Sequence, residues 1–376
     1  MNNNSDSYDT YKGKKVLITG HTGFKGSWLS AWLTELGAQV IGYSLEPPTK
    51  PSMFEAISLQ DKVTHIIGDV RDEEHLLAVF SKYQPEFVFH LAAQPIVRLS
   101  YKDPKLTYET NVMGTVNVLE AIRKTKSVRV AVVITSDKCY ENKEWIYGYR
   151  ETDPMGGYDP YSSSKGCAEL VVSAYRRSFF NPGRYNEHKV ALSSARAGNV
   201  IGGGDWGQDR LVPDCIRALS ESKVIKIRNP NAVRPWQYVL EPLSGYLLLG
   251  AKMYQDGDKF VGAWNFGPPD SDIIRVEEIV KRIISYWGNG RYKIAASSKN
   301  PHEAKLLKLD CSKAHSLLNW NSVYNINGTL KETAEWYSRY YNGIRGRELY
   351  EFTVKQIREY MKRDSHFLYK NTGEDI

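Results

Sequence analysis

Apolar residues in the first 200 positions follow two alternating patterns: short continuous runs, and longer stretches in which they recur every three or four residues. A short apolar run that ends at glycine or polar residues predicts a buried strand, and the longer spacing predicts an amphipathic helix. Strands are predicted at 14–20, 38–45, 85–93, 128–136 and 190–202, and helices at 26–37, 73–83, 107–125 and 163–179. This alternation predicts parallel strands joined by helical crossovers, with ligands bound where the strands end.

The pattern changes near residue 200, where loops rich in Gly, Pro and Trp separate shorter elements. We therefore expect an α/β protein, a doubly wound parallel sheet of the Rossmann type with a smaller C-terminal lobe that binds substrate. Residues 1–12 are polar and are expected to form a disordered leader, residues 13–200 the first domain, and residues 201–376 mainly the second lobe and C-terminal helices, with the lobes interleaved. The charged and aromatic stretch 330–364 predicts helices that pack on the surface.

The composition limits the class of protein and the partners to be expected. The 376 residues are 41% hydrophobic and 25% charged, as in ordinary globular proteins, and the net charge of +7 comes from scattered Lys and Arg, which favours a solvated basic surface over a nucleic-acid site. No apolar stretch reaches the roughly 18 residues of a membrane span, so we expect a cytoplasmic protein with no membrane partner. The four cysteines show no CxxC or zinc spacing and the histidines no cluster, so we expect reduced thiols and no metal.

The first chemical signal is a glycine pattern at the end of the first predicted strand. The sequence TGHTGFKG places Gly20, Gly23 and Gly26 in GxxGxxG spacing at the start of a helix. The first glycine permits a tight turn, the second lets backbone amides approach a pyrophosphate, and the third lets the helix close on the sheet. Ordinary turns also use glycine, but the strand–glycine–helix setting favours a dinucleotide, and we expect the first domain to bind NAD.

The segment after the second strand departs from the usual NAD pattern. An acidic residue there commonly holds the adenosine ribose hydroxyls, whereas this chain has the sequence YSLE at 43–46. No arginine stands there to bind a 2′-phosphate, so NAD is still favoured over NADP. Asp69, in the sequence GDVRD just before the helix predicted at 73–83, is either an adenine contact or a turn residue. The expected cofactor contacts outside the glycines are Thr22, Phe24, Lys25, Tyr43, Ser44, Asp69 and Val70.

Tyr161 and Lys165 have the YxxxK spacing, which places both side chains on one face of a helix. A nearby ammonium lowers the pKa of a tyrosine, and the phenolate can then take a proton from a sugar hydroxyl while hydride leaves the same carbon. The bare spacing is also common in surface Tyr–Lys pairs. Combined with the glycine pattern, and with Ser136 at the end of an intervening strand, it indicates a catalytic pair.

Together these motifs resemble those of an extended short-chain dehydrogenase/reductase. The resemblance spans about residues 14–330 and rests on TGxxGxxG, HLAAQ at 90–94, Asn111, TSDK and YxxxK. Within that family, the acid and basic residue after the serine are similar to those of nucleotide-sugar 4,6-dehydratases, most of which have Thr-Asp-Glu where this chain has the sequence SDK at 136–138. That lysine, with the segments 198–214 and 227–239, resembles the CDP-glucose 4,6-dehydratases.

The resemblance implies an NAD-dependent lyase that converts CDP-glucose to CDP-4-keto-6-deoxyglucose in deoxysugar biosynthesis, as for the O-antigen of lipopolysaccharide. Tyr161, with Ser136 and Lys165, would oxidise carbon 4, and NADH would return hydride to carbon 6. Asp137 is expected to be the acid that releases the 6-hydroxyl as water, provided burial keeps it protonated. Lys138 is expected either to remove the carbon 5 proton or to act structurally. The resemblance adds Leu91, Ala92, Ala93 and Asn111 as cofactor contacts. Tyr161 and Lys165 are also expected to contact the cofactor, with Lys165 holding the nicotinamide ribose.

A sugar nucleotide carries a diphosphate, and arginine grips phosphate oxygens through two donors. Arg210 and Arg234 are therefore expected to bind it, with Asn199 donating a hydrogen bond. A loop arginine is more commonly a solvated surface charge, so the position within the family carries this assignment. The expected substrate contacts are Gln94, Arg98, Asn199, Arg210, Leu211 and Arg234.

Three other functions stay open at this point. The substrate could be another nucleotide sugar, linked to dTDP or UDP, because loop contacts set the base preference. A 4-epimerase or reductase would share the fold, although neither needs the pair Asp137 and Lys138. A non-catalytic NAD sensor would not need an intact catalytic set. By resemblance we also expect a homodimer or a tetramer, paired through the helices that carry Asn111 and YxxxK.

Overall fold

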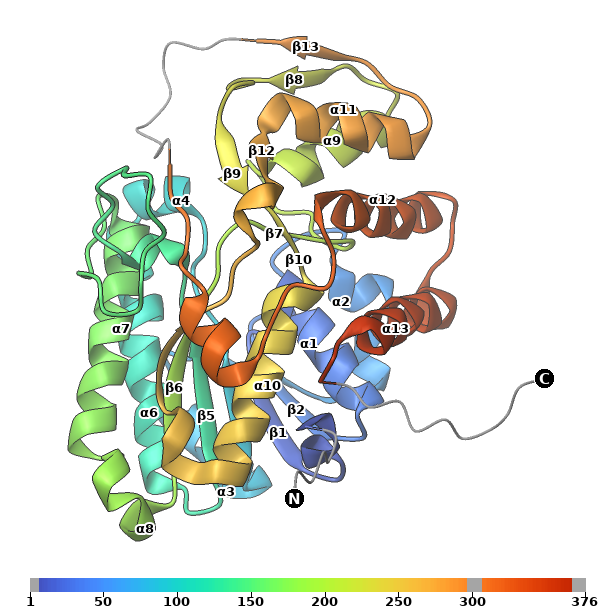
Figure 1. Ribbon diagram of the computed structural model, residues 1–376. Helices are drawn as coiled ribbons and strands as arrows, with labels where there is room; N and C mark the ends of the chain where they lie inside the picture. Colours follow the sequence, from blue (N-terminus) through green and yellow to red (C-terminus); the bar gives the residue numbers. More distant parts are fainter. Residues whose placement is uncertain (1–6, 296–305, 367–376) are drawn as a thin grey trace.

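The computed structural model describes residues 7–295 and 306–366 and is built around one parallel sheet (Figure 1). The seven strands lie in the order β11-β6-β5-β4-β1-β2-β3, and each neighbouring pair is parallel. They are β1 (Lys15–Thr19), β2 (Gln39–Ser44), β3 (Thr64–Ile67), β4 (Phe87–His90), β5 (Val130–Ile134), β6 (Ala191–Arg196) and β11 (Gly262–Asn265). This order confirms the predicted doubly wound Rossmann sheet.

Helices cover both faces of the sheet because successive side chains of a strand point to opposite faces. In β1, Leu17 belongs to one core, while Val16 and Ile18 belong to the other. The first core is closed by α3 (Glu73–Tyr83), α6 (Gly114–Lys124) and α7 (Pro160–Ser178), and the second by α1 (Phe24–Glu35) and α10 (Leu240–Asp256). Short helices lie in the connections: α2 (Met53–Ala56), α4 (Val97–Lys102), α5 (Pro104–Tyr108) and α8 (Tyr185–His188).

Two predicted elements are subdivided in the structure. The helix predicted at 107–125 consists of the end of α5, a π-helical turn (Glu109–Met113) and α6. The strand predicted at 190–202 ends with β6, and the chain resumes as β7 (Val200–Ile201) in a separate small sheet. Between them Asn199 takes a left-handed conformation with φ of +39°, which ends the extended run.

The second lobe lies above the main sheet in Figure 1 and is made of short paired strands and three helices. Its elements are β7, β8 (Ile225–Ile227), β9 (Val233–Pro235), β10 (Gln237–Tyr238), β12 (Ile273–Arg275), β13 (Tyr292–Ile294), α9 (Leu211–Ser220), α11 (Val276–Trp287) and α12 (Ile326–Tyr341). Between β10 and β12 the chain returns to the first lobe, where α10 covers the sheet and β11 extends its edge. The chain therefore crosses between the lobes more than once, as an interleaved arrangement requires.

The start of the chain corrects the expected disorder of residues 1–12. Residues Ser7–Tyr11 form a 3-10 helix in which Tyr8 and Tyr11 are buried. The Tyr11 hydroxyl donates to the Leu247 carbonyl at 2.6 Å, and the Tyr8 hydroxyl donates to Asp364 at 2.8 Å. Burial of two aromatic rings outweighs the polar character of the segment, so the expectation of disorder is wrong for residues 7–12; residues 1–6 lie outside the described part.

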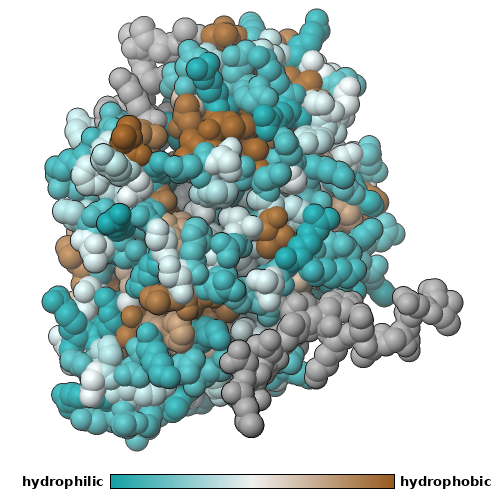
Figure 2. All heavy atoms as spheres, in the orientation of Figure 1, coloured by the Kyte–Doolittle hydropathy of each residue, from teal (hydrophilic) through white to brown (hydrophobic). Residues whose placement is uncertain are grey.

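The C-terminal helices α12 and α13 (Gly346–Arg363) also differ from the expectation of a surface position. Trp336, Tyr337 and Tyr360 are fully buried, and the Tyr360 hydroxyl donates to Glu241 of α10 at 2.7 Å. One face of the pair thus belongs to the core, while the opposite face carries the charges. None of the helices within residues 7–295 and 306–366 has the length and apolar character that crossing a membrane requires. The face drawn in Figure 2 is mainly hydrophilic, with separate hydrophobic patches.

Candidate active site

The glycine turn after β1 is shaped so that only glycine fits. Gly20 has φ of +77°, and a Cβ atom there would lie 2.7 Å from the Ala92 backbone nitrogen. A Cβ atom on Gly26 would lie 2.1 Å from the Gly20 carbonyl oxygen. Gly23 is the N-cap of α1 and offers no side-chain cap, so the first N–H groups of the helix are available to an anion. The turn therefore fits the pyrophosphate of a dinucleotide.

Side chains near the end of β2 are held by each other. Thr22 Oγ1 lies 2.8 Å from Ser44 Oγ and donates to the Leu45 carbonyl at 2.9 Å. Tyr43 is buried, and its hydroxyl donates to the Asp69 carbonyl at 2.9 Å. Tyr43 and Ser44 thus fix the shape of this edge of the predicted cofactor site, and Tyr43 links it to the turn after β3.

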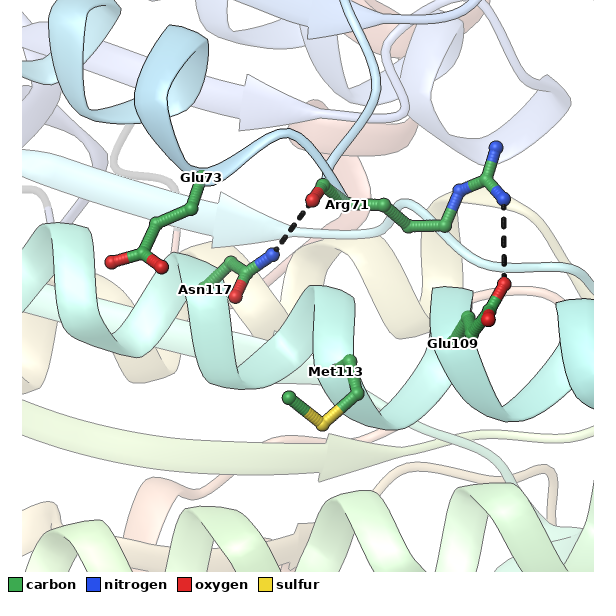
Figure 3. A pocket seen from close by; sticks show the side chains of 5 residues that line it. All are labelled: Arg71, Glu73, Glu109, Met113 and Asn117. Atoms are coloured by element: carbon green, nitrogen blue, oxygen red, sulfur yellow. Dashed lines mark hydrogen bonds and ion pairs between the residues drawn. The ribbon is translucent and has the colours of Figure 1, made fainter.

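A pocket of about 350 Å³ lies beside the turn that contains Asp69 and Val70. Figure 3 shows its lining residues, which come from the turn before α3, the first residue of α3, the π-helical turn and α6: Arg71, Glu73, Glu109, Met113 and Asn117. Asn117 donates to the carbonyls of Val70 (3.0 Å) and Arg71 (3.2 Å). The Asp69 carboxylate is ion-paired with Arg71 at 2.6 Å. The pocket contains none of the predicted catalytic residues, and its contacts fix the turn.

Asn111 and Gln94 form a second structural link beside the predicted cofactor site. The Asn111 amide donates to Ser164 Oγ of α7 at 2.9 Å and to the Gln94 carbonyl at 3.1 Å, and it accepts from the Gln94 backbone N–H at 2.8 Å. The Gln94 side chain bonds Ile96 and Thr107. The loop that carries Leu91, Ala92 and Ala93 is thereby tied to α7. Gln94, predicted to contact substrate, has its side-chain amide engaged within the chain.

The sequence SDK follows β5 as a short 3-10 turn, Asp137–Cys139. Ser136 Oγ donates to Asp137 Oδ1 at 3.0 Å, and it accepts the Lys138 backbone N–H at 3.3 Å. Asp137 is buried, whereas Lys138 is partly exposed. Burial raises the pKa of Asp137, against the lowering effects of the Lys138 ammonium and of the hydrogen bond from Ser136. The carboxyl is therefore biased towards the protonated form that a general acid needs.

Tyr161 and Lys165 lie in the first turns of α7, next to the turn formed by residues 136–139. The Lys165 ammonium donates to the Ile134 carbonyl at 3.5 Å. Burial raises the pKa of Tyr161 to about 12, although a hydrogen bond with Ser136 lowers it, and burial lowers the pKa of Lys165 to about 8. The expected depression of the tyrosine pKa is thus wrong for the protein alone, because desolvation outweighs the nearby polar groups. The structure does bring Ser136, Asp137, Tyr161 and Lys165 together.

Lys25, expected to contact the cofactor, lies within the same group of charges. Its ammonium is 3.4 Å from the Tyr246 hydroxyl of α10. Burial, the Lys165 ammonium and the Arg210 guanidinium lower the pKa of Lys25 to about 8, while Asp137 raises it. Tyr246 was not found from the sequence, because it lies more than 200 positions from Lys25 and carries no motif.

Among the predicted substrate residues, Arg210 lies near this group. Arg210 is ion-paired with the buried Asp205 at 2.8 Å, and it is near enough to Tyr161 to influence its pKa. Arg98 of α4 is ion-paired with Asp209 at 2.9 Å, which links the two lobes. Leu211 begins α9, Asn199 lies in the bend after β6, and Arg234 lies in β9 with one guanidinium nitrogen 2.9 Å from the Val233 carbonyl. Asp205, which fixes Arg210, could not be identified from the sequence because it belongs to no recognised motif.

The cysteines take no part in this geometry. All four, Cys139, Cys167, Cys215 and Cys311, are free, as predicted. Burial raises the pKa of Cys139, Cys215 and Cys311, so these thiols stay protonated and unreactive at neutral pH.

Comparison with known proteins agrees with the fold and the motifs. A model of the GDP-mannose 4,6-dehydratase family matches residues 17–333. The chain is 52% identical to a CDP-glucose 4,6-dehydratase of Salmonella typhimurium over 93% of this chain and 97% of that enzyme. Among solved structures, an epimerase of Methanothermobacter thermautotrophicus is similar with a TM-score of 0.77 and 22% identity, covering 91% and 97% of the two chains. A dTDP-glucose 4,6-dehydratase of Bacillus anthracis in complex with NAD is similar with a TM-score of 0.71 and 21% identity, covering 88% and 98%.

Proposed function

Because the chain belongs to the GDP-mannose 4,6-dehydratase family, we propose that it is an NAD-dependent nucleotide-sugar 4,6-dehydratase that converts CDP-glucose to CDP-4-keto-6-deoxyglucose. Identity of 52% to a CDP-glucose 4,6-dehydratase, over nearly the full length of both chains, supports this substrate. One observation carries the reaction type: a buried, protonation-prone Asp137 lies beside Tyr161 and Lys165. A 4-epimerase needs the Tyr–Lys pair but has no use for this second acid.

The chain offers a fitting site for NAD. Gly20, Gly23 and Gly26 would let the backbone and the N-terminus of α1 hold the pyrophosphate, and the loop fixed by Asn111 would border the nicotinamide end. When bound, NAD supplies a positively charged ring that accepts hydride from carbon 4 and returns it to carbon 6.

Tyr161 acts as the base of the first step, in which it takes the proton of the 4-hydroxyl. With a pKa of about 12 the resting side chain is a phenol, so the phenolate needs nearby positive charge to form. Lys165, with a pKa of about 8, is protonated at pH 7 and supplies such a charge from the same helix face. Ser136 lowers the pKa of Tyr161, against the effect of burial, and we assign its hydroxyl to the oxygen on carbon 4.

Asp137 and Lys138 act after carbon 4 has become a ketone. The ketone acidifies the proton on carbon 5, and we assign its removal to Lys138. Asp137 then donates a proton to the 6-hydroxyl, so that the carbon–oxygen bond breaks, water leaves, and a double bond forms between carbons 5 and 6. Hydride addition at carbon 6 and protonation at carbon 5 complete the product.

The test is incubation of the purified protein and NAD with CDP-, dTDP-, UDP- and GDP-glucose in parallel. We expect a 4-keto-6-deoxy sugar from CDP-glucose, with the highest kcat/KM of the four, and none from Tyr161→Phe. A product inverted at carbon 4, with oxygen retained at carbon 6, would show a 4-epimerase instead. Higher kcat/KM with another nucleotide would keep the reaction but change the substrate.

The assembly and location of the enzyme form part of the same proposal. We assign a homodimer to the helical face around α6 and α7, because Met113 and Leu170 expose 51% and 60% of their surface there. We place the reaction in the cytoplasm, where nucleotide sugars and NAD are available. Analytical ultracentrifugation of the protein and of Leu170→Glu tests the dimer, because the charged variant should sediment as a monomer; an unchanged dimer would place the interface elsewhere.

A further inference from the structure

A buried ion pair lies beside residues 136–139, which we call the catalytic turn. It takes no part in the chemistry described so far. Glu169 of α7 lies one helical turn after Lys165, and its carboxylate is 2.7 Å from the guanidinium of Arg196 at the end of β6. Both side chains are only 4% exposed. Burial alone would raise the pKa of Glu169, but the ion pair and its hydrogen bonds hold that pKa below the usual value, so the carboxylate is charged.

The two charged groups hold the residues on either side of the catalytic turn. Thr135, immediately before Ser136, donates its hydroxyl to Glu169 at 2.5 Å. Tyr140, immediately after Cys139, accepts from Arg196 at 2.6 Å, and the guanidinium also lies 4.9 Å from the Tyr140 ring centroid. Residues 136–139 are thus fastened at both ends to a single buried pair.

The far side of the pair is fastened as well. The Tyr140 hydroxyl donates to Asn265 Oδ1 at 2.8 Å at the end of β11, and Arg196 donates to the Glu151 carbonyl at 3.2 Å. Glu169 also accepts from Ser194 Oγ of β6 at 2.7 Å. Residues from β6, β11 and α7 therefore fix the position of the pair relative to the sheet.

An ion pair in the interior is a poor source of stability, because desolvation of two charges offsets most of their attraction. What it provides is a fixed geometry, since each group has directional partners. We propose that Glu169 and Arg196 are positioning residues that clamp the catalytic turn 136–139 at both ends, so that Asp137 and Lys138 are aligned for the elimination step. This inference rests on the proposed dehydratase function.

The Glu169 carboxylate also acts on the Tyr161–Lys165 pair through its charge. Burial lowers the pKa of Lys165 to about 8, and Glu169 is the leading group that opposes this effect. Loss of the carboxylate charge therefore lowers the Lys165 pKa further, and Lys165 becomes neutral at a lower pH. A role in packing alone would leave the pH profile of the oxidation step where it is.

The first experiment compares two variants, each of which removes one hydroxyl that donates to the Glu169 carboxylate. Thr135→Val removes the hydrogen bond that fastens the turn, and Ser194→Ala removes one of similar length that fastens only the sheet. In single turnovers of the holoenzyme with CDP-glucose, reduced cofactor appears during oxidation and disappears during the final reduction. For Thr135→Val we expect its disappearance to slow about threefold to tenfold, the range that one lost hydrogen bond gives. Its appearance should slow less, because Ser136 is the one residue of the turn that acts in oxidation. For Ser194→Ala we expect neither rate to change.

Equal behaviour of the two variants, or equal slowing of both steps by Thr135→Val, would overturn the clamp. In Glu169→Gln, the pH at which oxidation declines on the alkaline side should move downwards; an unchanged profile in a folded variant would overturn the charge effect. If Glu169→Gln does not fold, Tyr140→Phe repeats the test at the other end of the turn and should slow the later steps more than oxidation. Absence of any product from the unmodified protein would instead reject the proposed function, independently of the clamp.

Discussion

Gly198 lies against Asp137, the acid of the proposed mechanism. Adding a single methyl group at Gly198 should slow the elimination of water without slowing the oxidation at carbon 4. A Cβ atom at this position would be 1.9 Å from Asp137 Oδ2 and 2.3 Å from its Cγ, whereas ordinary contacts lie at 3.4–4 Å. Gly198→Ala must therefore move the carboxyl by about 1.5 Å, the difference between 1.9 Å and 3.4 Å. The backbone at Gly198 does not have a positive φ, so alanine adds this contact without backbone strain.

The expected effect falls on elimination. A displacement of about 1 Å can cost roughly a hundredfold in rate when a group must be aligned with its target. Oxidation at carbon 4 depends on Tyr161 and Lys165, which the methyl group does not touch. In single turnovers with CDP-glucose, we therefore expect reduced cofactor to form at a normal rate and to persist, because water loss at carbon 6 is slowed about a hundredfold. Overpacking should also lower the free energy of unfolding by about 1–3 kcal/mol.

Gly267→Ala is the matched control. Its Cβ atom would meet Cys311 and Leu309 at 3.5 Å, which is ordinary contact, so both steps should keep their rates. The reasoning is refuted if Gly198→Ala completes the reaction at the rate of the control, or if oxidation and elimination slow by the same factor. The second result would mean that Asp137 shapes substrate binding and does not act after oxidation.

Three further changes test other parts of the structure. Gly26→Ala places a Cβ atom 2.1 Å from the Gly20 carbonyl, so NAD should bind roughly tenfold or more weakly by calorimetry, and unchanged affinity would remove the glycine turn from the cofactor site. Asp205→Asn weakens the ion pair that fixes Arg210, so KM for CDP-glucose should rise about tenfold with little change in kcat, and a fall in kcat alone would contradict the assignment of Arg210 to binding. Burial raises the pKa of Glu241 from 4.5 to about 7, so its contribution is present below pH 4.5 and is lost as pH rises through 7. The free energy of unfolding should fall by up to about 3 kcal/mol over that range in urea titrations, and Glu241→Gln should show a weaker dependence; an equal slope would contradict the burial argument.

The architecture of the first lobe could be predicted from the sequence because its signals are local. Buried parallel strands read as continuous apolar runs, and GxxGxxG specifies a turn between a strand and the helix that directly follows it in sequence. The prediction was wrong where tertiary contacts decide. Tyr8 and Tyr11 lie in a polar segment yet fill the space beside α10 and α13, and Trp336 and Tyr337 lie in a charged stretch yet belong to the core.

Some of the residues expected to do the chemistry could be predicted from the sequence, but the residues that hold them in place could not. Motif spacing and the family resemblance pointed to Asp137 and Tyr161, and the structure places both beside Ser136. The groups that hold them come from elsewhere in the chain: Gly198 follows another strand, and Arg196 reaches the catalytic turn across the sheet. Glu169 alone had a usable signal, since four residues after Lys165 is the same helix face. The direction of the Tyr161 pKa shift required burial, which the sequence does not report.

The most direct test of the central claim follows the hydride from carbon 4. CDP-glucose deuterated at carbon 4 is converted by the holoenzyme in ordinary water, and the product is analysed by NMR and mass spectrometry. The account predicts that deuterium appears at carbon 6 of a 4-keto-6-deoxy sugar, with no net release of reduced cofactor, because one bound NAD takes and returns the same hydride. Deuterium retained at carbon 4, or released with reduced cofactor into solution, would contradict 4,6-dehydration by this protein.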